Sequence, residues 1–253
     1  MSGLLGGRPV RWVRPPDGAL RGTHLHFHGG GYRVGTPELD VPLASHLARR
    51  LRVQVALPAY RLAPAHPFPA AVEDGLAAYG ALLAGGTPAE RITVGGDSAG
   101  GGLAFAVLLA AQEAGLPAPA AAIGLSPWLD LTLTAASFER CAATDPLLGR
   151  DSLGDSAAVY LAGADPRTPT ASPLFAEDKA LAALPPALLQ ASRDEVLCDD
   201  AVRFAERVKA AGGACRVELW PGTTHCWQLS VATSAEAVRA ADSVAEFLTQ
   251  HFD

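Results

Sequence analysis

The sequence predicts an α/β protein whose mostly parallel central sheet carries helices on both faces. Short β-branched and apolar runs alternate along the chain with amphipathic stretches of helical length, which is typical of parallel strands joined by helical crossovers. The 253 residues, of which 49% are hydrophobic, are enough to enclose one large core. We therefore expect residues 1–253 to form a single domain.

This alternation assigns most of the chain to either a β-strand or an α-helix. We expect strands at residues 10–14, 23–27, 53–57, 92–94, 120–125, 188–192 and 216–219. We expect helices at residues 40–51, 70–83, 103–114, 199–211 and 235–250. Residues 132–173 depart from the pattern, because this segment between two strands is far longer than a crossover loop. We expect it to be a small cap insertion with a helix at 151–161, above the C-terminal edge of the sheet.

Composition and charge exclude several classes of function. The net charge is −6 without a basic patch, which argues against binding to nucleic acid. The longest apolar helical run, residues 102–111, is too short to span a membrane, and the N-terminus does not have the pattern of a signal peptide. Cys141, Cys198, Cys215 and Cys226 lack C-x-x-C spacing. We therefore expect a cytoplasmic protein.

The most informative motif is Gly96-x-Ser98-x-Gly100, which lies between the expected strand 92–94 and the expected helix 103–114. A serine at the tip of a tight strand–turn–helix requires glycine two positions away on each side, because a Cβ there would clash. The turn raises the Ser98 hydroxyl above a helix N-terminus, where developing negative charge is favoured. This placement predicts that Ser98 is a nucleophile.

A glycine-rich loop, His28-Gly29-Gly30-Gly31, follows the expected strand 23–27. Successive glycines permit a backbone that turns several N–H groups toward one point, as an oxyanion requires. We expect Gly30, Gly31 and Ala99, the residue after the serine, to supply these donors. His28 is expected to hold the loop by hydrogen bonds, and we assign supporting roles to Gly29 and Asp97 as well.

Ser98 needs a base and an acid that orients the base. His225 follows the strand 216–219 and a turn, and Asp194 directly follows the strand 188–192. Both positions lie where loops reach the C-terminal edge of the sheet. We therefore predict Asp194 as the acid and His225 as the base. Glu195, Asp199 and Asp200 compete with Asp194, although the last two fit better as N-terminal caps of the helix 199–211.

A different chemistry is suggested by His24-x-His26-x-His28. Alternate residues of a strand share one face, so three histidines with this spacing could ligate a metal. The alternative hypothesis is therefore a metal-dependent hydrolase. It would leave the serine elbow unexplained.

Together these motifs resemble the hormone-sensitive lipase family of α/β-hydrolases, in particular its bacterial esterases. The resemblance covers nearly the whole chain from about residue 10. It rests on His28-Gly29-Gly30-Gly31, Tyr60-Arg61-Leu62-Ala63-Pro64, His66-Pro67-Phe68-Pro69-Ala70-Ala71, Gly96-Asp97-Ser98-Ala99-Gly100-Gly101, Asp194-Glu195-Val196-Leu197 and His225. The chain departs from the family at Ala65, where a glutamate is usual.

The resemblance implies an α/β-hydrolase fold, the triad of Ser98, Asp194 and His225, and oxyanion donors from Gly30, Gly31 and Ala99. It further implies carboxylesters with short to medium acyl chains as substrates, and no cofactor. The family's N-terminal helical cap is not expected here, because few residues precede the first expected strand. We therefore expect an open pocket and exposed apolar surface that favours a homodimer. A lactone hydrolase and a non-catalytic ligand receptor on the same fold are further alternatives.

Overall fold

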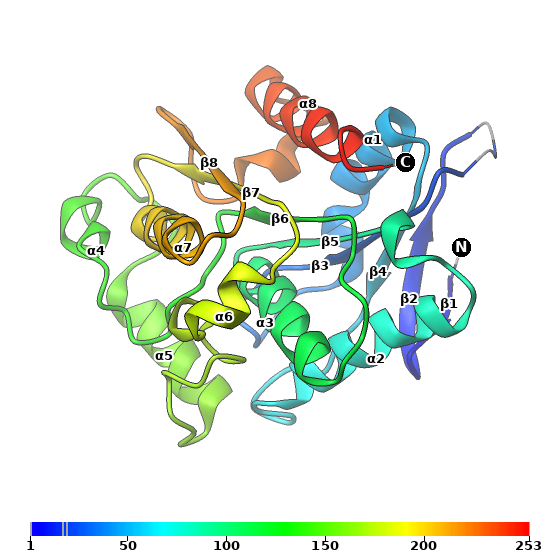
Figure 1. Ribbon diagram of the computed structural model, residues 1–253. Coiled ribbons are helices and arrows are strands. Elements are labelled where there is room, and N and C mark those ends of the chain that lie inside the picture. The colour runs from blue at the N-terminus through cyan, green and yellow to red at the C-terminus, as the bar shows by residue number, and fades with distance from the viewer. Residues whose placement is uncertain (1, 17, 19, 253) are drawn as a thin grey trace.

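The structure is a computed structural model that describes residues 2–16, 18 and 20–252 (Figure 1). Within these residues, eight strands form one sheet in the order β1-β2-β4-β3-β5-β6-β7-β8. They are β1 (Ser2–Leu5), β2 (Arg8–Val13), β3 (Thr23–Phe27), β4 (Gln54–Pro58), β5 (Ile92–Asp97), β6 (Ala121–Leu125), β7 (Ala187–Ser192) and β8 (Cys215–Trp220). Strands β3 to β8 are parallel, and β1 and β2 are antiparallel at one edge. The predicted fold class is confirmed.

Helices cover both faces of this sheet (Figure 1). The α-helices are α1 (Val41–Leu51), α2 (Ala70–Ala84), α3 (Ala99–Glu113), α4 (Ser137–Arg140), α5 (Arg150–Leu161), α6 (Asp178–Ala182), α7 (Cys198–Ala210) and α8 (Ala235–Thr249). The short 3-10 helices are η1 (Pro37–Asp40), η2 (Ala89–Arg91), η3 (Pro173–Phe175) and η4 (Trp227–Ser230). Helices α1 and α8 pack together on one face, and α2, α3 and α7 cover the other. Among the described residues, none of these helices combines the length and apolarity needed to cross a bilayer.

The sheet divides the core into two layers of buried side chains. On the α1 and α8 side, Leu47, Val55 and Leu248 belong to one cluster. On the other side, Phe105 and Phe204 meet edge to face between α3 and α7. Each fully buried side chain of this size contributes about 1.5–3 kcal/mol to folding. The central strands β3, β5 and β6 are therefore held firmly from both faces, and their C-terminal ends provide a rigid edge.

The N-terminal edge of the sheet differs from the prediction of a first strand at residues 10–14. Strand β2 begins at Arg8, and β1 precedes it as the partner of a hairpin. Gly6 and Gly7 join the two strands with φ angles of +56° and +81°. These left-handed conformations are easily adopted by glycine, so the glycines that disfavour a helix here form a turn instead.

Helix α3 begins at Ala99, four residues before the predicted start at residue 103. Gly100, Gly101 and Gly102 lie inside its first turn, although glycine disfavours helix interiors. A Cβ on Gly100 would lie 2.0 Å from the Phe27 carbonyl oxygen, and one on Gly102 would lie 2.1 Å from that of Trp128. The glycines are thus required by the close approach of α3 to neighbouring backbone, which outweighs their low helix propensity.

We expect the Gly100→Ala variant to lose about 1–3 kcal/mol of unfolding free energy, the cost typical of overpacking. The Gly80→Ala variant is the matched control, because Gly80 lies inside α2 with no atom within 4 Å of an added Cβ. It should gain up to about 1 kcal/mol from higher helix propensity. Urea denaturation of both variants measures the difference. Equal stabilities would show that the approach of α3 to β3 does not require glycine.

Candidate active site

Ser98 lies at a strained turn between β5 and α3, as the elbow motif predicts. Its φ and ψ angles are +53° and −122°, a conformation that a residue with a side chain rarely adopts. The Ser98 N–H donates to the carbonyl of Leu125 at 2.8 Å, and its carbonyl accepts from Trp128 N–H at 2.9 Å. The backbone of the neighbouring strand and loop therefore fixes the serine and directs its hydroxyl away from the sheet.

The Ser98 hydroxyl, His225 and Glu195 form one line of short polar contacts. The His225 Nε2 atom lies 2.9 Å from Ser98 Oγ, and its Nδ1 atom lies 2.6 Å from Glu195 Oε2. The second carboxylate oxygen of Glu195 accepts from Ser192 N–H at 2.8 Å. Glu195 is 1% exposed, so its carboxylate is shielded from solvent while both of its oxygens are bonded. The structure therefore brings Ser98 and His225 within hydrogen-bond distance, as a nucleophile and its base require.

The structure contradicts the assignment of Asp194 as the partner of His225. Asp194 is half-buried, and its Oδ2 accepts from Gly222 N–H at 2.8 Å. Asp194 therefore secures the turn that precedes His225, while Glu195 contacts the imidazole. Two adjacent side chains on the turn after β7 point in different directions, and only the second reaches the ring. The sequence offers both acids as candidates but does not show their orientation.

The surroundings of His225 favour its protonated form. Burial alone lowers the pKa of His225, but the hydrogen bond to Glu195 and the charges of Glu195, Asp97 and Asp145 outweigh it. The pKa of His225 therefore lies above its ordinary value of 6.5. A raised pKa makes the neutral imidazole a stronger base toward a neighbouring hydroxyl.

The predicted supporting residues hold the glycine loop in place. Gly29 N–H donates to Asp97 Oδ2 at 3.1 Å, and the His28 Nδ1 atom lies 2.7 Å from the Gly29 carbonyl oxygen. The ring of His28 is stacked on Tyr60, whose hydroxyl donates to the His28 carbonyl at 2.7 Å. Gly30 has a φ of +110°, and a Cβ on it would lie 2.1 Å from the Val34 carbonyl oxygen. A larger residue would therefore distort the loop.

A cavity of about 510 Å³ opens over these groups and includes Gly30, Gly31, Ser98 and His225 in its lining. Its apolar walls comprise Val34, Leu39, Leu147, Leu148, Leu153 and Leu229. Residues 147–156 belong to the segment 132–173, so this segment forms one wall of the cavity. A larger hollow of about 630 Å³ lies near the other end of α3, beside Leu109, Gln112 and Lys179. It lies away from the reactive groups, so its size does not indicate a catalytic role.

The three histidines of β3 and its following loop do not converge on one point. His24 contacts Thr93 Oγ1 at 2.9 Å and His26 at 3.3 Å, whereas His28 is directed toward its own loop. Among the described residues, the titratable side chains that gather here are instead His26, Asp40 and Asp97. The hypothesis of a metal on His24, His26 and His28 therefore gains no support from the way these side chains lie.

His26, Asp40 and Asp97 form a buried cluster directly below the elbow. The His26 Nε2 atom lies 3.5 Å from Asp97 Oδ1 and 3.9 Å from Asp40 Oδ2. Burial and the charge of Asp97 raise the pKa of Asp40 to about 9. The shift favours the neutral form of Asp40, in which the repulsion between two adjacent charged carboxylates is absent. The sequence does not reveal this cluster, because its members come from three separate segments.

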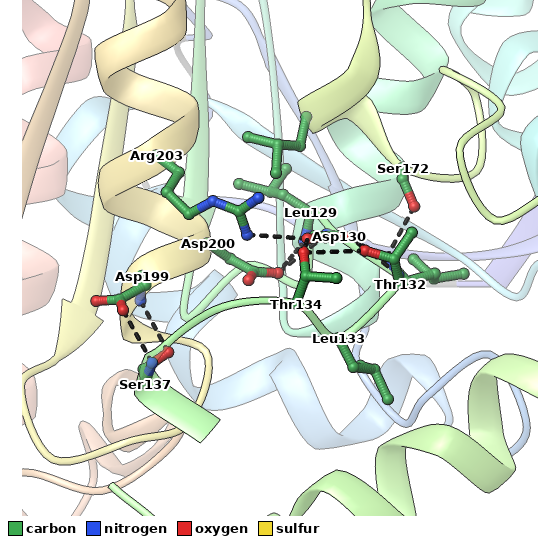
Figure 2. A network of polar contacts seen from close by, with 12 residues as sticks. Leu129, Asp130, Thr132, Leu133, Thr134, Ser137, Ser172, Asp199, Asp200 and Arg203 are labelled. Atoms are coloured by element: carbon green, nitrogen blue, oxygen red, sulfur yellow. Dashed lines mark hydrogen bonds and ion pairs between the residues drawn. The ribbon is translucent and has the colours of Figure 1, made fainter. Parts of the chain in front are cut away.

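Asp199 holds the segment 132–173, and Asp200 holds the residues directly before it, rather than capping α7 as expected (Figure 2). Asp200 accepts from the N–H groups of Leu129 and Asp130 at 2.9 Å and 3.0 Å. Asp199 accepts from Ser137 N–H at 2.9 Å and pairs with Arg140. The helix begins after Leu197 without a side-chain cap. The carboxylates of Asp199 and Asp200 thus accept from donors that lie far away in the sequence. The preference of aspartate for helix N-termini gives no indication of these donors.

Asp130, directly before the segment, extends this network (Figure 2). Its carboxylate accepts from Thr132 and Thr134 and pairs with Arg203 of α7 at 2.9 Å. The Leu131 N–H donates to Ser172 Oγ at 2.8 Å, so the two ends of the segment meet. These bonds place the segment firmly against α7 and beside the turn that carries Glu195.

We expect NMR titration to give a pKa for His225 above 6.5 in the wild-type protein. In the Glu195→Gln variant, the charge that outweighs burial is lost, and the pKa should fall below that value. The Asp194→Asn variant is the matched control and should leave the pKa unchanged, because Asp194 contacts Gly222 rather than the ring. A pKa that fell in the Asp194 variant alone would restore the assignment made from the sequence.

Comparison of the chain with known proteins identifies its relatives. The model of the alpha/beta hydrolase fold family matches residues 24–229. An acetyl-hydrolase of Streptomyces hygroscopicus is 43% identical over 94% of this chain and 79% of its own length. An ethyl acetate hydrolase of Pseudomonas putida is 36% identical over 96% of this chain and 78% of its own length.

A solved structure agrees with these relatives. The crystal structure of an esterase from the bacterial hormone-sensitive lipase family superimposes with a TM-score of 0.96. The two sequences are 41% identical, and the match covers all of this chain and 84% of the esterase. The resemblance predicted from the motifs is thereby confirmed. The chain belongs to the hormone-sensitive lipase family of alpha/beta hydrolases and is a serine carboxylester hydrolase.

Proposed function

We propose that the protein hydrolyses carboxylic esters with short to medium acyl chains, using Ser98 as nucleophile, His225 as base and Glu195 as the orienting acid. The observation that carries this proposal is the line of contacts at 2.9 Å and 2.6 Å that joins the three side chains. It ends on the floor of an apolar cavity, where an ester can reach the hydroxyl. Glu195 takes the role that the sequence analysis gave to Asp194.

The reaction follows from these positions as a two-step acyl transfer. His225 Nε2 accepts the Ser98 proton as the hydroxyl attacks the ester carbonyl, and Glu195 stabilises the imidazolium that forms. The N–H groups of Gly30, Gly31 and Ala99 are the proposed donors to the oxyanion, which such preorganised groups stabilise by several kcal/mol. His225 then protonates the leaving alcohol. A water activated by the same histidine hydrolyses the acyl-enzyme.

The rim of the cavity supports an open site for the alcohol part of the ester. Val34, Leu39 and Leu147 are 66%, 63% and 61% exposed and belong to its lining. Apolar side chains that remain in solvent around a cavity are typical of a surface that receives an apolar group. Bulky esters and lactones are therefore further proposed substrates. A homodimer and a cytoplasmic location stay predictions.

We expect Ser98→Ala and His225→Ala to lower kcat/KM for p-nitrophenyl butyrate by at least about 10³-fold, because the relay acts as a unit. His46→Ala is the matched control, since His46 pairs with Asp242 on the outer helices α1 and α8. Circular dichroism verifies that each variant is folded. EDTA should leave the activity unchanged. Loss of activity in EDTA, with full activity in Ser98→Ala, would favour the metal hypothesis over the proposed mechanism.

The open rim predicts that bulky alcohols are tolerated. Values of kcat/KM for acetate esters of small and bulky alcohols should differ by less than about tenfold, or 1.4 kcal/mol of transition-state binding. Steady-state kinetics with one acid and a series of alcohols measures the ratio. A decrease of a hundredfold or more for the bulky esters, about 2.7 kcal/mol, would show a closed pocket.

A further inference from the structure

The turn that carries Glu195, residues 193–196, is held by the segment 132–173 through both its carbonyl and its N–H groups. Thr144 Oγ1 donates to the Asp194 carbonyl at 2.9 Å, and Ser137 Oγ donates to the Val196 carbonyl at 2.5 Å. Val196 N–H, which directly follows Glu195, donates to Asp145 Oδ2 at 2.9 Å. These bonds come from one short stretch of the segment, residues 137–145. The position of Glu195 therefore depends on this stretch.

Asp145 contacts the wall of the cavity as well. Its other oxygen, Oδ1, accepts from the N–H groups of Leu147 and Leu148, both at 3.0 Å. Leu147 and Leu148 line the cavity over Ser98. A single carboxylate thus joins the wall that contacts the substrate to the turn that carries the proposed acid. Backbone N–H groups donate to both of its oxygens, so the carboxylate is held on two sides.

The burial of Asp145 makes its charge relevant to the reaction. Asp145 is 8% exposed, and its carboxylate accepts hydrogen bonds from three backbone N–H groups. The acidic groups that act on His225 are Glu195 from the turn after β7, Asp97 from the end of β5, and Asp145 from the segment. Glu195 bonds to the imidazole and Asp97 bonds to the glycine loop. Asp145 instead bonds to Leu147, Leu148 and Val196. Its effect on the base is therefore exerted at a distance.

We propose that Asp145 is a positioning residue for ester hydrolysis, which keeps Glu195 in register with the substrate-contacting wall at Leu147 and Leu148. The proposal rests on the proposed function, because it assumes that Glu195 orients His225. Asp145 itself is not part of the cavity lining. Its carboxylate binds the turn that carries Glu195 and, on the other side, the backbone of Leu147 and Leu148 in the cavity wall.

The test compares Asp145→Asn with a matched control, Asp165→Asn. The asparagine can still accept from Leu147 and Leu148, but its amide group cannot accept from Val196 and carries no charge. Asp165 lies in the same segment and also accepts from a backbone N–H, that of Arg167 at 2.9 Å, but it is exposed. Esterase kinetics between pH 5 and 9 and thermal unfolding are measured for both variants.

We expect Asp145→Asn to lower kcat about tenfold with little change in KM, since a small displacement of a positioned group costs this much. The pKa of the acidic limb of kcat/KM should also fall, because one of the charges that favours the protonated imidazole is lost. Asp165→Asn should match the wild type in both. A decrease of kcat that accompanies a lower melting temperature, with no shift of the pH profile, would show a merely structural role and overturn the proposal.

Thr144→Val and Glu195→Gln complete the experiment. Thr144→Val removes one hydrogen bond to the same turn without a change of charge, so kcat should fall several-fold with no shift of the pH profile. If Asp145→Asn does not fold, wild-type kcat in Thr144→Val overturns the proposal. If Glu195→Gln retains full activity, the proposed function itself fails. If Glu195→Gln is inactive while Asp145→Asn keeps wild-type kcat and pH profile, the inference about Asp145 alone is wrong.

Discussion

The close approach of α3 to the end of β3 is the constraint on which the site depends. Gly96 and Gly100 allow the backbone of the elbow to lie against the carbonyl of Phe27, and this contact forces Ser98 into its strained conformation. The same approach brings the glycine loop beside the serine, because His28 and Gly29 follow Phe27 directly. Asp97, the residue before the serine, then binds Gly29 N–H. Nucleophile and loop are therefore placed by one packing contact.

Local sequence patterns predict the parts of this arrangement that are determined by backbone sterics. The strand–turn–helix around Ser98 and the order of strands and helices follow from glycine spacing and apolar runs, and His225 follows from its place after a strand. The choice between Asp194 and Glu195 has no such basis. On a turn, a shift by one residue decides whether Asp194 or Glu195 faces the imidazole ring. The hydrogen bonds that fix this turn come from Ser192, Gly222 and residues 137–145, which are not neighbours in the sequence.

Buried polar groups are the second feature that the sequence does not reveal. Asp199 and Asp200 stand at the start of a helix, where a local interpretation predicts caps, yet each accepts from a backbone N–H group more than 60 positions away. A buried carboxylate must find donors wherever the fold provides them, because an unpaired one is costly. Asp40 shows the other solution, since burial and the charge of Asp97 raise its pKa and so favour its neutral form. Both outcomes depend on tertiary contacts.

The segment 132–173 combines two tasks that are often separate in enzymes. Residues 147–156 contact the cavity, and residues 137–145 hold the turn below the proposed acid. Asp130 and Asp200 fix the residues directly before the segment to α7, and Asp199 fixes Ser137 within it, so contacts with α7 set its position. A change in this wall therefore acts on the acid as well as on the substrate. A substitution in this wall is therefore compatible with the proposed reaction only if Glu195 stays within hydrogen-bond distance of His225.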